Sequence, residues 1–232
     1  MRYLKQKKSQ ILLALFIISS LVLTFAPSTD LYISSLFFDH TFYAKNSWWE
    51  QLLYQSVTPF LTLSIIAILV LWLRNRGKAP HQQWGHIDGA KVLFFLLVLI
   101  IGSGLIVNYV FKEHFGRPRP KDITQFQGSK TFSPAFYITG HPQGNKSFSS
   151  GHGSAAFAAL PLALFFKRKK RALIIASAYG ALVSLARIAA GGHFFSDVIV
   201  SFFIMAITTD IFYYHFFTRK KAQHNENQCA EL

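Results

Sequence analysis

Long apolar runs are the feature that most constrains this chain. Segments of about 17–25 predominantly apolar residues, the length that crosses a bilayer, recur along its 232 residues. We identify six such runs, near residues 11–26, 57–73, 92–111, 153–166, 172–190 and 198–217. Backbone groups in lipid must form hydrogen bonds within their own segment, so each run is expected to be a helix. The predicted fold is an all-α integral membrane bundle of six transmembrane helices, a single domain over residues 1–232.

Composition excludes several classes of protein. Hydrophobic residues make up 51% of the chain and charged residues 15%, against about 25% charged in a typical soluble domain, so a disordered chain is excluded. The net charge of +14 sits in short clusters between the apolar runs rather than over a polar surface, which argues against a nucleic-acid partner. Cys229 is the single cysteine, so an intrachain disulfide and a cysteine zinc site are impossible.

The distribution of basic residues predicts the orientation in the membrane. Sixteen of the 24 Lys and Arg residues lie in four segments that the six runs place on one side: 2–8, 74–91, 167–171 and 219–221. An excess of Lys and Arg marks the cytoplasmic side, so both termini are expected there. The opposite side then receives residues 27–56, 112–152 and 191–197. The first run is expected to be an uncleaved anchor, because Pro27 follows it and a small-residue cleavage site is missing.

The segment between the first two runs is rich in aromatic and aliphatic residues. Trp48, Trp49, Leu52, Leu53 and Tyr54 recur at near-helical spacing. This pattern is typical of a helix that lies in the membrane interface, so a short interfacial helix is expected here, with a structural role.

Basic residues also occur on the non-cytoplasmic side, where the orientation rule predicts few. In the segment 112–120, Lys112 and Arg119 are separated by six residues, and Pro118 and Pro120 end the preceding helix. Arginine donates paired hydrogen bonds that suit phosphate oxygens. Read alone, the segment is equally consistent with a helix stop flanked by interfacial basic residues.

A second segment combines small residues with a histidine. Ser150, Gly151 and the following backbone amides precede the fourth run, and the N-terminus of a helix favours anions. His152 is placed to pass a proton to a leaving oxygen. The alternative is an ordinary helix cap beside an incidental histidine.

A third segment brings together Arg187, His193 and Asp197. His193 and Asp197 are four residues apart, so they share a face if a helix begins near His193. Asp197 then accepts a hydrogen bond from one ring nitrogen and leaves the other as a nucleophile or base. A buried His–Asp pair without a catalytic role is the alternative. A metal site built on the two histidines and Asp197 is disfavoured, because the nearby cations would repel a divalent ion.

Together, the three segments resemble the type-2 phosphatidic acid phosphatase superfamily of membrane phosphatases. The family pattern reads K-x6-R-P, P-S-G-H and S-R-x5-H-x3-D. Here it corresponds to Lys112…Arg119-Pro120, Ser149-Ser150-Gly151-His152 and Ala186-Arg187…His193…Asp197. The resemblance covers about residues 108–197. Ser149 stands where the family has proline, and Ala186 where it has serine.

The resemblance implies a role for each matching residue. His193 would attack the phosphorus to form a phosphohistidine, Asp197 would hold its tautomer, and His152 would protonate the leaving oxygen. The phosphoryl oxygens would be bound by five groups: Lys112, Arg119, Ser150, the amide of Gly151, and Arg187. The family requires no metal and no cofactor.

Three stretches, 108–112, 116–120 and 191–197, are most similar to bacterial lipid A phosphatases, especially the 4′-phosphatase branch. This implies a lipid substrate in a bacterial inner membrane, a periplasmic active site and no obligatory protein partner. Four further basic residues are expected to contact a bulky anionic head group: Arg117, Lys121, Lys130 and Lys146. A phosphatase of undecaprenyl diphosphate or phosphatidylglycerophosphate stays open. So does a transporter or binding protein for anionic lipids, although the paired broken helices typical of transporters are not evident.

Overall fold

The computed structural model describes residues 2–139 and 145–218 of the chain. Its helices, in chain order, are α1 (Arg2–Phe25), α2 (Ser28–Ser35), α3 (Trp48–Asn75), α4 (Gly89–Leu97), α5 (Lys112–His114), α6 (Gly151–Phe157), α7 (Ala159–Ala163), α8 (Lys169–Ala189) and α9 (Phe195–Tyr213). A π-helical stretch, Val98–Phe111, joins α4 to α5, and another, Tyr214–Thr218, extends α9. Short 3₁₀ turns occur at Pro80–Gln82, Trp84–His86, Pro120–Asp122 and Thr124–Phe126.

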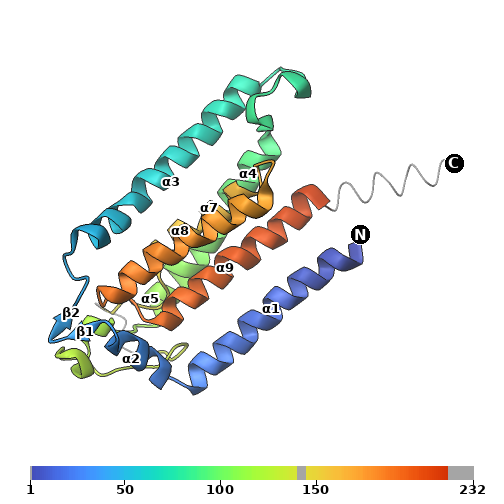
Figure 1. The fold of residues 1–232 in the computed structure, drawn as a ribbon. Helices are drawn as coiled ribbons and strands as arrows, with labels where there is room; N and C mark the ends of the chain where they lie inside the picture. Colours follow the sequence, from blue (N-terminus) through green and yellow to red (C-terminus); the bar gives the residue numbers. More distant parts are fainter. Residues whose placement is uncertain (1, 140–144, 219–232) are drawn as a thin grey trace.

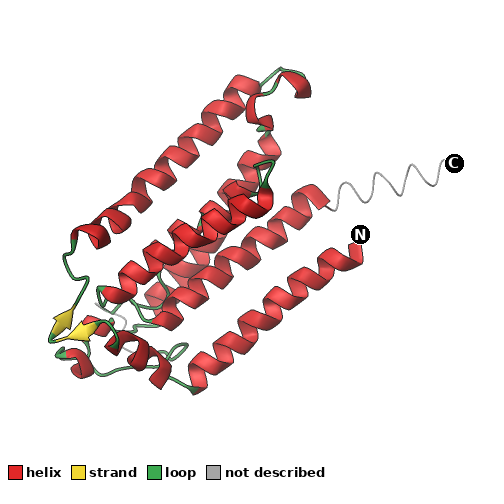
Figure 2. Ribbon diagram, in the orientation of Figure 1, coloured by secondary structure: helices red, strands yellow, loops and turns green. Residues whose placement is uncertain are grey.

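The long helices run side by side, with α1 and α3 on opposite outer sides of the group formed by α4, α7, α8 and α9 (Figure 1). A two-residue antiparallel ladder, β1 (Phe38–Asp39) with β2 (Thr41–Phe42), lies near α2. The ladder, α2 and the loop after α5 gather at one end of the bundle, where α8 ends and α9 begins (Figure 2). Apart from this ladder, the regular secondary structure of the described residues is therefore helical, as expected.

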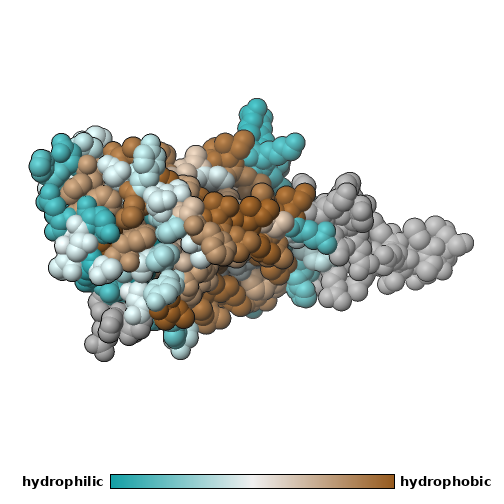
Figure 3. Space-filling model, turned by 90° about the horizontal axis from the view of Figure 1, so that it is seen from below, coloured by the Kyte–Doolittle hydropathy of each residue, from teal (hydrophilic) through white to brown (hydrophobic). Residues whose placement is uncertain are grey.

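Among the described residues, four helical segments are long and apolar enough to cross a membrane: Trp48–Asn75, Gly89–His114, Lys169–Ala189 and Phe195–Thr218. A fifth span results if Ser9–Phe25 and Ser28–Ser35, bent by 83° at their junction, count as one. Hydrophobic side chains cover the middle of the molecule, and hydrophilic ones gather toward its ends (Figure 3). The prediction of a multi-pass helical membrane protein is confirmed at this coarser level.

The six-helix count is not confirmed, because the fourth apolar run divides into two short helices. Residues 153–163 fall in α6 and α7, separated at Ala158, Pro161 lies inside α7, and residues 164–166 form a turn after it. Proline cannot donate a backbone hydrogen bond and disturbs the preceding turn. Neither helix alone has the length of a membrane span, although together they lead the chain along α8 from the end that holds His152 to the end that holds Arg168.

The separate interfacial helix is also corrected. The segment from Trp48 to Tyr54 forms the first turns of α3. Ser47 caps the N-terminus of this helix, since its side chain accepts a hydrogen bond from the Glu50 amide at 3.4 Å. At 1.5 Å per residue the 28 residues of α3 extend about 42 Å, longer than the roughly 30 Å hydrocarbon core. One long helix therefore supplies both a span and turns that project beyond it. The short helix in this region is α2.

Close packing of α6 against α8 determines where the N-terminus of α6 lies along the length of α8. Gly180 of α8 faces the ring of Phe157, and a Cβ at this glycine would overlap that ring. Phe157 belongs to a buried cluster with Phe94, Val98 and Met205. Because Gly180 lets the two helices approach, the N-terminus of α6 comes to lie beside the C-terminal turn of α8.

Candidate active site

The three segments identified in the sequence meet at the end of the bundle that carries α2 and the β-ladder. Lys112 begins α5, His152 lies in the first turn of α6, and Arg187 lies in the last turn of α8. His193 occupies the turn between α8 and α9, and Asp197 the first turn of α9. The predicted convergence of two histidines, a carboxylate and several cations is present.

The turn before His193 depends on two glycines. Gly191 has a φ of +67°, in the left-handed region that favours glycine. A Cβ at Gly192 would overlap the Arg187 guanidinium, and the Gly192 amide donates to the Arg187 carbonyl at 2.8 Å. The turn therefore folds back onto Arg187 and brings His193 beside it.

The ring of His193 is fixed by a backbone carbonyl as well as by Asp197. Its Nδ1 lies 2.9 Å from the Ser147 carbonyl oxygen and 3.5 Å from Asp197 Oδ2. Both oxygens are acceptors, so Nδ1 carries the proton and Nε2 retains its lone pair. Burial lowers the pKa of His193, against the opposing effect of Asp197. The buried ring is thus neutral, with Nε2 as its nucleophilic atom.

Asp197 is a fully buried carboxylate with several donors. It accepts hydrogen bonds from Ser147 Oγ at 2.6 Å and from the Phe194 amide at 2.9 Å, the latter capping α9. Its second oxygen, Oδ1, lies 2.6 Å from Arg117 Nη1. A buried charge needs such partners to remain ionised, so the carboxylate is held rigidly beneath the His193 ring.

Arg117 is therefore not a head-group contact, contrary to the sequence-based expectation. Its side chain is 1% exposed. Nε donates to the Ser133 carbonyl at 2.9 Å, and Nη2 pairs with Asp30 Oδ2 at 2.7 Å. Asp30 and Asp197 are both buried, and two buried carboxylates require a cation between them. Arg117 fills that position instead of facing the surface.

The amino-terminal part of α3 contributes two residues that the sequence analysis did not assign to the site. The Tyr54 ring stacks on the His152 ring, with centroids 4.1 Å apart, and the Arg187 guanidinium lies 4.7 Å from the Tyr54 centroid. Glu50 forms an ion pair with Arg187. Arg187 Nε is buried without a hydrogen-bond partner among the described residues, so it keeps a donor for a ligand.

His152 lies among positive charges. Burial, followed by the effects of Arg187 and His193, lowers the pKa of His152 to about 4. The imidazole is therefore neutral at pH 7 in the unliganded site. A bound dianion would oppose the nearby positive charge and raise this pKa.

The phosphate-binding residues proposed from the sequence surround the start of α6. Ser150 Oγ accepts from the Gly153 amide at 3.1 Å, which leaves its hydroxyl proton available to a ligand. A Cβ at Gly151 would lie 3.3 Å from Lys112 Nζ, so the ammonium group is directly beside this glycine. Arg119 is near enough to His152 and His193 to lower the pKa of both.

The other expected head-group residues form no contact with the two histidines or Asp197 among the described interactions. Lys146 pairs with Glu113 at 2.6 Å, both about half exposed, and Lys130 donates to Asn145. Lys121 is exposed. Within residues 2–139 and 145–218, no group of three or more His, Cys, Asp or Glu side chains converges as a metal site would require. Cys229 lies outside the described residues.

A family model described as the PAP2 superfamily matches residues 92–221. The match covers more than half of the chain and all three functional segments. The chain belongs to the PAP2 superfamily. The predicted family membership is thereby confirmed.

Two relatives carry the same name. A lipid A 4'-phosphatase of Francisella tularensis subsp. novicida is 45% identical over 108 residues, which cover 45% of this chain and 49% of the relative. The chain thus spans about half the length of this relative. A lipid A 4'-phosphatase of Rhizobium leguminosarum is 32% identical over 184 residues, covering 72% of this chain and 78% of the relative.

One solved structure shares the fold. The crystal structure of a transmembrane PAP2-type phosphatidylglycerolphosphate phosphatase from Bacillus subtilis superposes with a TM-score of 0.57. The superposition covers 91% of this chain and 98% of that one, at 19% identity. The shared arrangement of helices extends well beyond the three motifs.

Proposed function

We propose that this chain is a lipid phosphatase that removes a phosphate monoester from lipid A through a phosphohistidine at His193. The observation that carries the proposal is the anchored ring of His193, whose Nδ1 faces two acceptors while cations surround the site. The PAP2 membership and the names of the two relatives support the reaction class and the 4′ position.

The first chemical step follows from this geometry. Nε2 of His193 attacks the phosphorus, and an Nε2–P bond forms as the P–O bond to the lipid breaks. The leaving oxygen takes a proton from His152. That proton comes from the substrate: a phosphate monoester with a second pKa near 6 enters partly as the monoanion and passes its proton to His152, whose pKa the bound dianion raises. Asp197 stabilises the positive charge that develops on the His193 ring.

The second step returns the site to its starting state. Neutral His152 accepts a proton from water as the water oxygen attacks the phosphorus and the Nε2–P bond breaks. His152 passes this proton to the departing inorganic phosphate, which leaves as the monoanion, and both histidines are again neutral imidazoles. Lys112, Arg119 and Arg187 stabilise the charge on the phosphoryl oxygens in both steps, the role that metal ions have in other phosphoryl-transfer sites.

The membrane location is part of the same proposal. The clustering of sixteen of 24 basic residues in four segments supports cytoplasmic termini and a periplasmic site in a bacterial inner membrane. Lys121, Lys130 and Lys146 lie on the loop that follows α5 and precedes α6. These cations suit a bulky anionic saccharide better than a small glycerol head group.

Purified protein tests the substrate directly. We expect it to remove one phosphate from lipid A, detected by mass spectrometry, with kcat/KM at least tenfold above that for phosphatidylglycerophosphate or undecaprenyl diphosphate at equal mole fraction in mixed micelles. Faster turnover of either competitor would show that this competitor, and not lipid A, is the preferred substrate. Binding of all three lipids without release of inorganic phosphate would instead identify a transporter or binding protein.

A further inference from the structure

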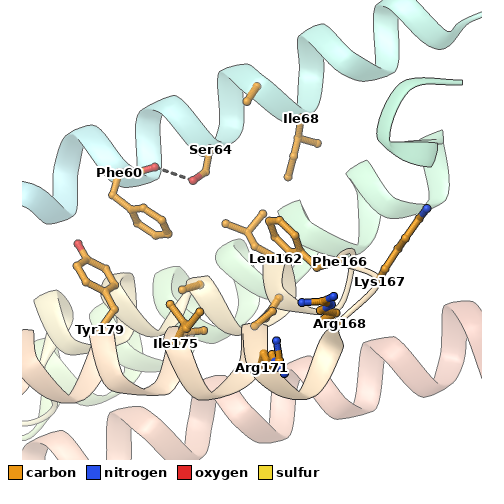
Figure 4. A pocket seen from close by; sticks show the side chains of 15 residues that line it. Phe60, Ser64, Ile68, Leu162, Phe166, Lys167, Arg168, Arg171, Ile175 and Tyr179 are labelled. Carbon is orange, nitrogen blue, oxygen red and sulfur yellow. Dashed lines mark hydrogen bonds between the residues drawn. The ribbon is translucent and has the colours of Figure 1, made fainter.

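A large groove, lined by neither histidine of the candidate active site, lies between α3 on one side and α7 and α8 on the other (Figure 4). Its volume is about 1030 Å³, at the upper end of the roughly 300–1,000 Å³ of ordinary ligand pockets. The walls are almost entirely apolar, with Phe60 and Ile68 from α3 facing Leu162 and Ile175. Such a surface favours hydrocarbon as its occupant.

Along the apolar part of the groove, the few polar side chains are already satisfied. Ser64 Oγ donates to the Phe60 carbonyl at 2.7 Å, as the dashed line in Figure 4 shows. The Tyr179 hydroxyl and Ser56 Oγ lie 2.9 Å apart, and the Tyr179 and Phe60 rings pack with centroids 5.1 Å apart. These contacts join α3 to α8 at the end of the groove that points toward His152, so they separate the groove from the candidate active site.

The opposite end of the groove is strongly basic. Lys167, Arg168 and Arg171 line it, all three are exposed, and none forms an ion pair with a carboxylate among the described residues. Arg171 and Arg187 are sixteen residues apart on α8, which corresponds to about 24 Å along the helix. These cations therefore do not serve the phosphoryl-transfer site.

The dimensions match one leaflet of a bilayer. From Arg171 to Tyr179 the groove follows eight residues of α8, about 12 Å. Half of a hydrocarbon core of roughly 30 Å is about 15 Å. A phospholipid of one leaflet whose acyl chains lie between Ile68 and Ile175 would therefore have its head group beside the three cations. Basic residues beside membrane helices favour anionic lipid head groups.

We propose that this groove is a binding site for an anionic phospholipid of the leaflet opposite the active site. The head-group phosphate contacts Lys167, Arg168 and Arg171, and the acyl chains fill the space between α3 and α8. The site is distinct from the one that carries the phosphatase proposal and holds or fails independently of it.

Binding of phosphatidylglycerol and phosphatidylethanolamine to the purified full-length chain, measured by native mass spectrometry, tests the proposal. The double variant Arg168→Gln/Arg171→Gln is expected to bind phosphatidylglycerol about 30-fold more weakly, since each basic residue near a membrane surface contributes about 1 kcal/mol. The matched control is Lys169→Gln/Lys170→Gln, which removes the same charge from the same turn but leaves the groove lining intact. Equal losses in both variants, or equal binding of the two lipids by the unmodified chain, would overturn the proposal.

A second pair of variants tests the apolar part of the groove. Ala67→Trp narrows it, because Ala67 lines the groove from α3, whereas Leu63→Trp alters an exposed residue of α3 outside the lining. We expect phosphatidylglycerol binding to fall at least fivefold in the first variant only, with catalytic turnover within twofold of the unmodified protein in both. If Ala67→Trp changes the oligomeric state and not lipid binding, the groove is an interface between copies and the proposal is wrong.

Discussion

Arg117 Nη1 lies 2.6 Å from Asp197 Oδ1, and the other guanidinium nitrogen pairs with Asp30 of α2. All three side chains are buried. This network ties the bend after α1 to the carboxylate that faces His193. His193, the proposed nucleophile, is therefore oriented by residues contributed by three distant parts of the chain.

Removing Arg117 is expected to affect stability and turnover together. Arg117→Ala leaves two buried carboxylates without their cation, and breaking a buried ion pair destabilises proteins by about 3–5 kcal/mol. We expect a large fall in the thermal unfolding midpoint and a loss of kcat. Lys146→Ala is the control, because its ion pair with Glu113 is exposed and such pairs contribute about 1 kcal/mol or less. Equal unfolding midpoints in the two variants would show that the buried network does not matter.

The acid sensitivity of the protein is expected to depend on His152. Its pKa is about 4 in the folded state against 6.5 for an ordinary histidine, so the unfolded state binds the proton more tightly. Stability should therefore fall as the pH decreases from 6.5 toward 4. His152→Gln should flatten that part of the curve, as measured by unfolding midpoints at pH 7 and pH 4.5. An identical pH dependence in the variant would contradict the low pKa.

The proposed topology places Ser129 outside the cytoplasm and Lys169 inside it. After replacement of Cys229, single cysteines at these two positions are expected to differ in their reaction with a membrane-impermeant thiol reagent in intact spheroplasts. Position 129 should be labelled, and position 169 only after lysis. Labelling of position 169 alone in intact cells would reverse the orientation and exclude a periplasmic substrate.

Turnover is expected to be independent of metal ions, because Lys112, Arg119 and Arg187 supply the positive charge that a metal would provide. Activity should survive excess EDTA. Vanadate, which mimics five-coordinate phosphorus, should inhibit competitively with the lipid. If EDTA abolishes activity and one divalent ion restores it, this mechanism is wrong.

Residue spacing within short motifs predicted the core of the site. Contacts between residues far apart in the sequence could not be predicted in this way. The four-residue spacing of His193 and Asp197 predicted that the two side chains meet, and they do, although α9 begins only at Phe195 and His193 lies in the turn before it. Asp30 and Arg117 are 87 residues apart, and Glu50 and Arg187 are 137 apart, so sequence spacing carries no information about those pairs. The Ser147 carbonyl is a backbone group and leaves no side-chain signal.

The membrane segments, too, could be predicted only in part from the sequence. Hydropathy identified the long spans because bilayer thickness fixes their length. It misjudged residues 153–166, where apolar character continues while the backbone breaks at Ala158. Hydropathy also failed at the start of α3, because aromatic residues at the interface give the same sequence pattern in a helix that lies flat and in one that continues across the membrane.

Trapping of the covalent intermediate identifies the residue that attacks the phosphorus. The purified protein would be mixed with lipid A labelled with ³²P at the 4′-phosphate and quenched in alkali, in which phosphohistidine is more stable than in acid. The account predicts label on the peptide that contains His193, and in His193→Gln no label and a turnover reduced on the order of 10⁴-fold or more. Label on another residue, or more than a few per cent of the activity in His193→Gln, would contradict it.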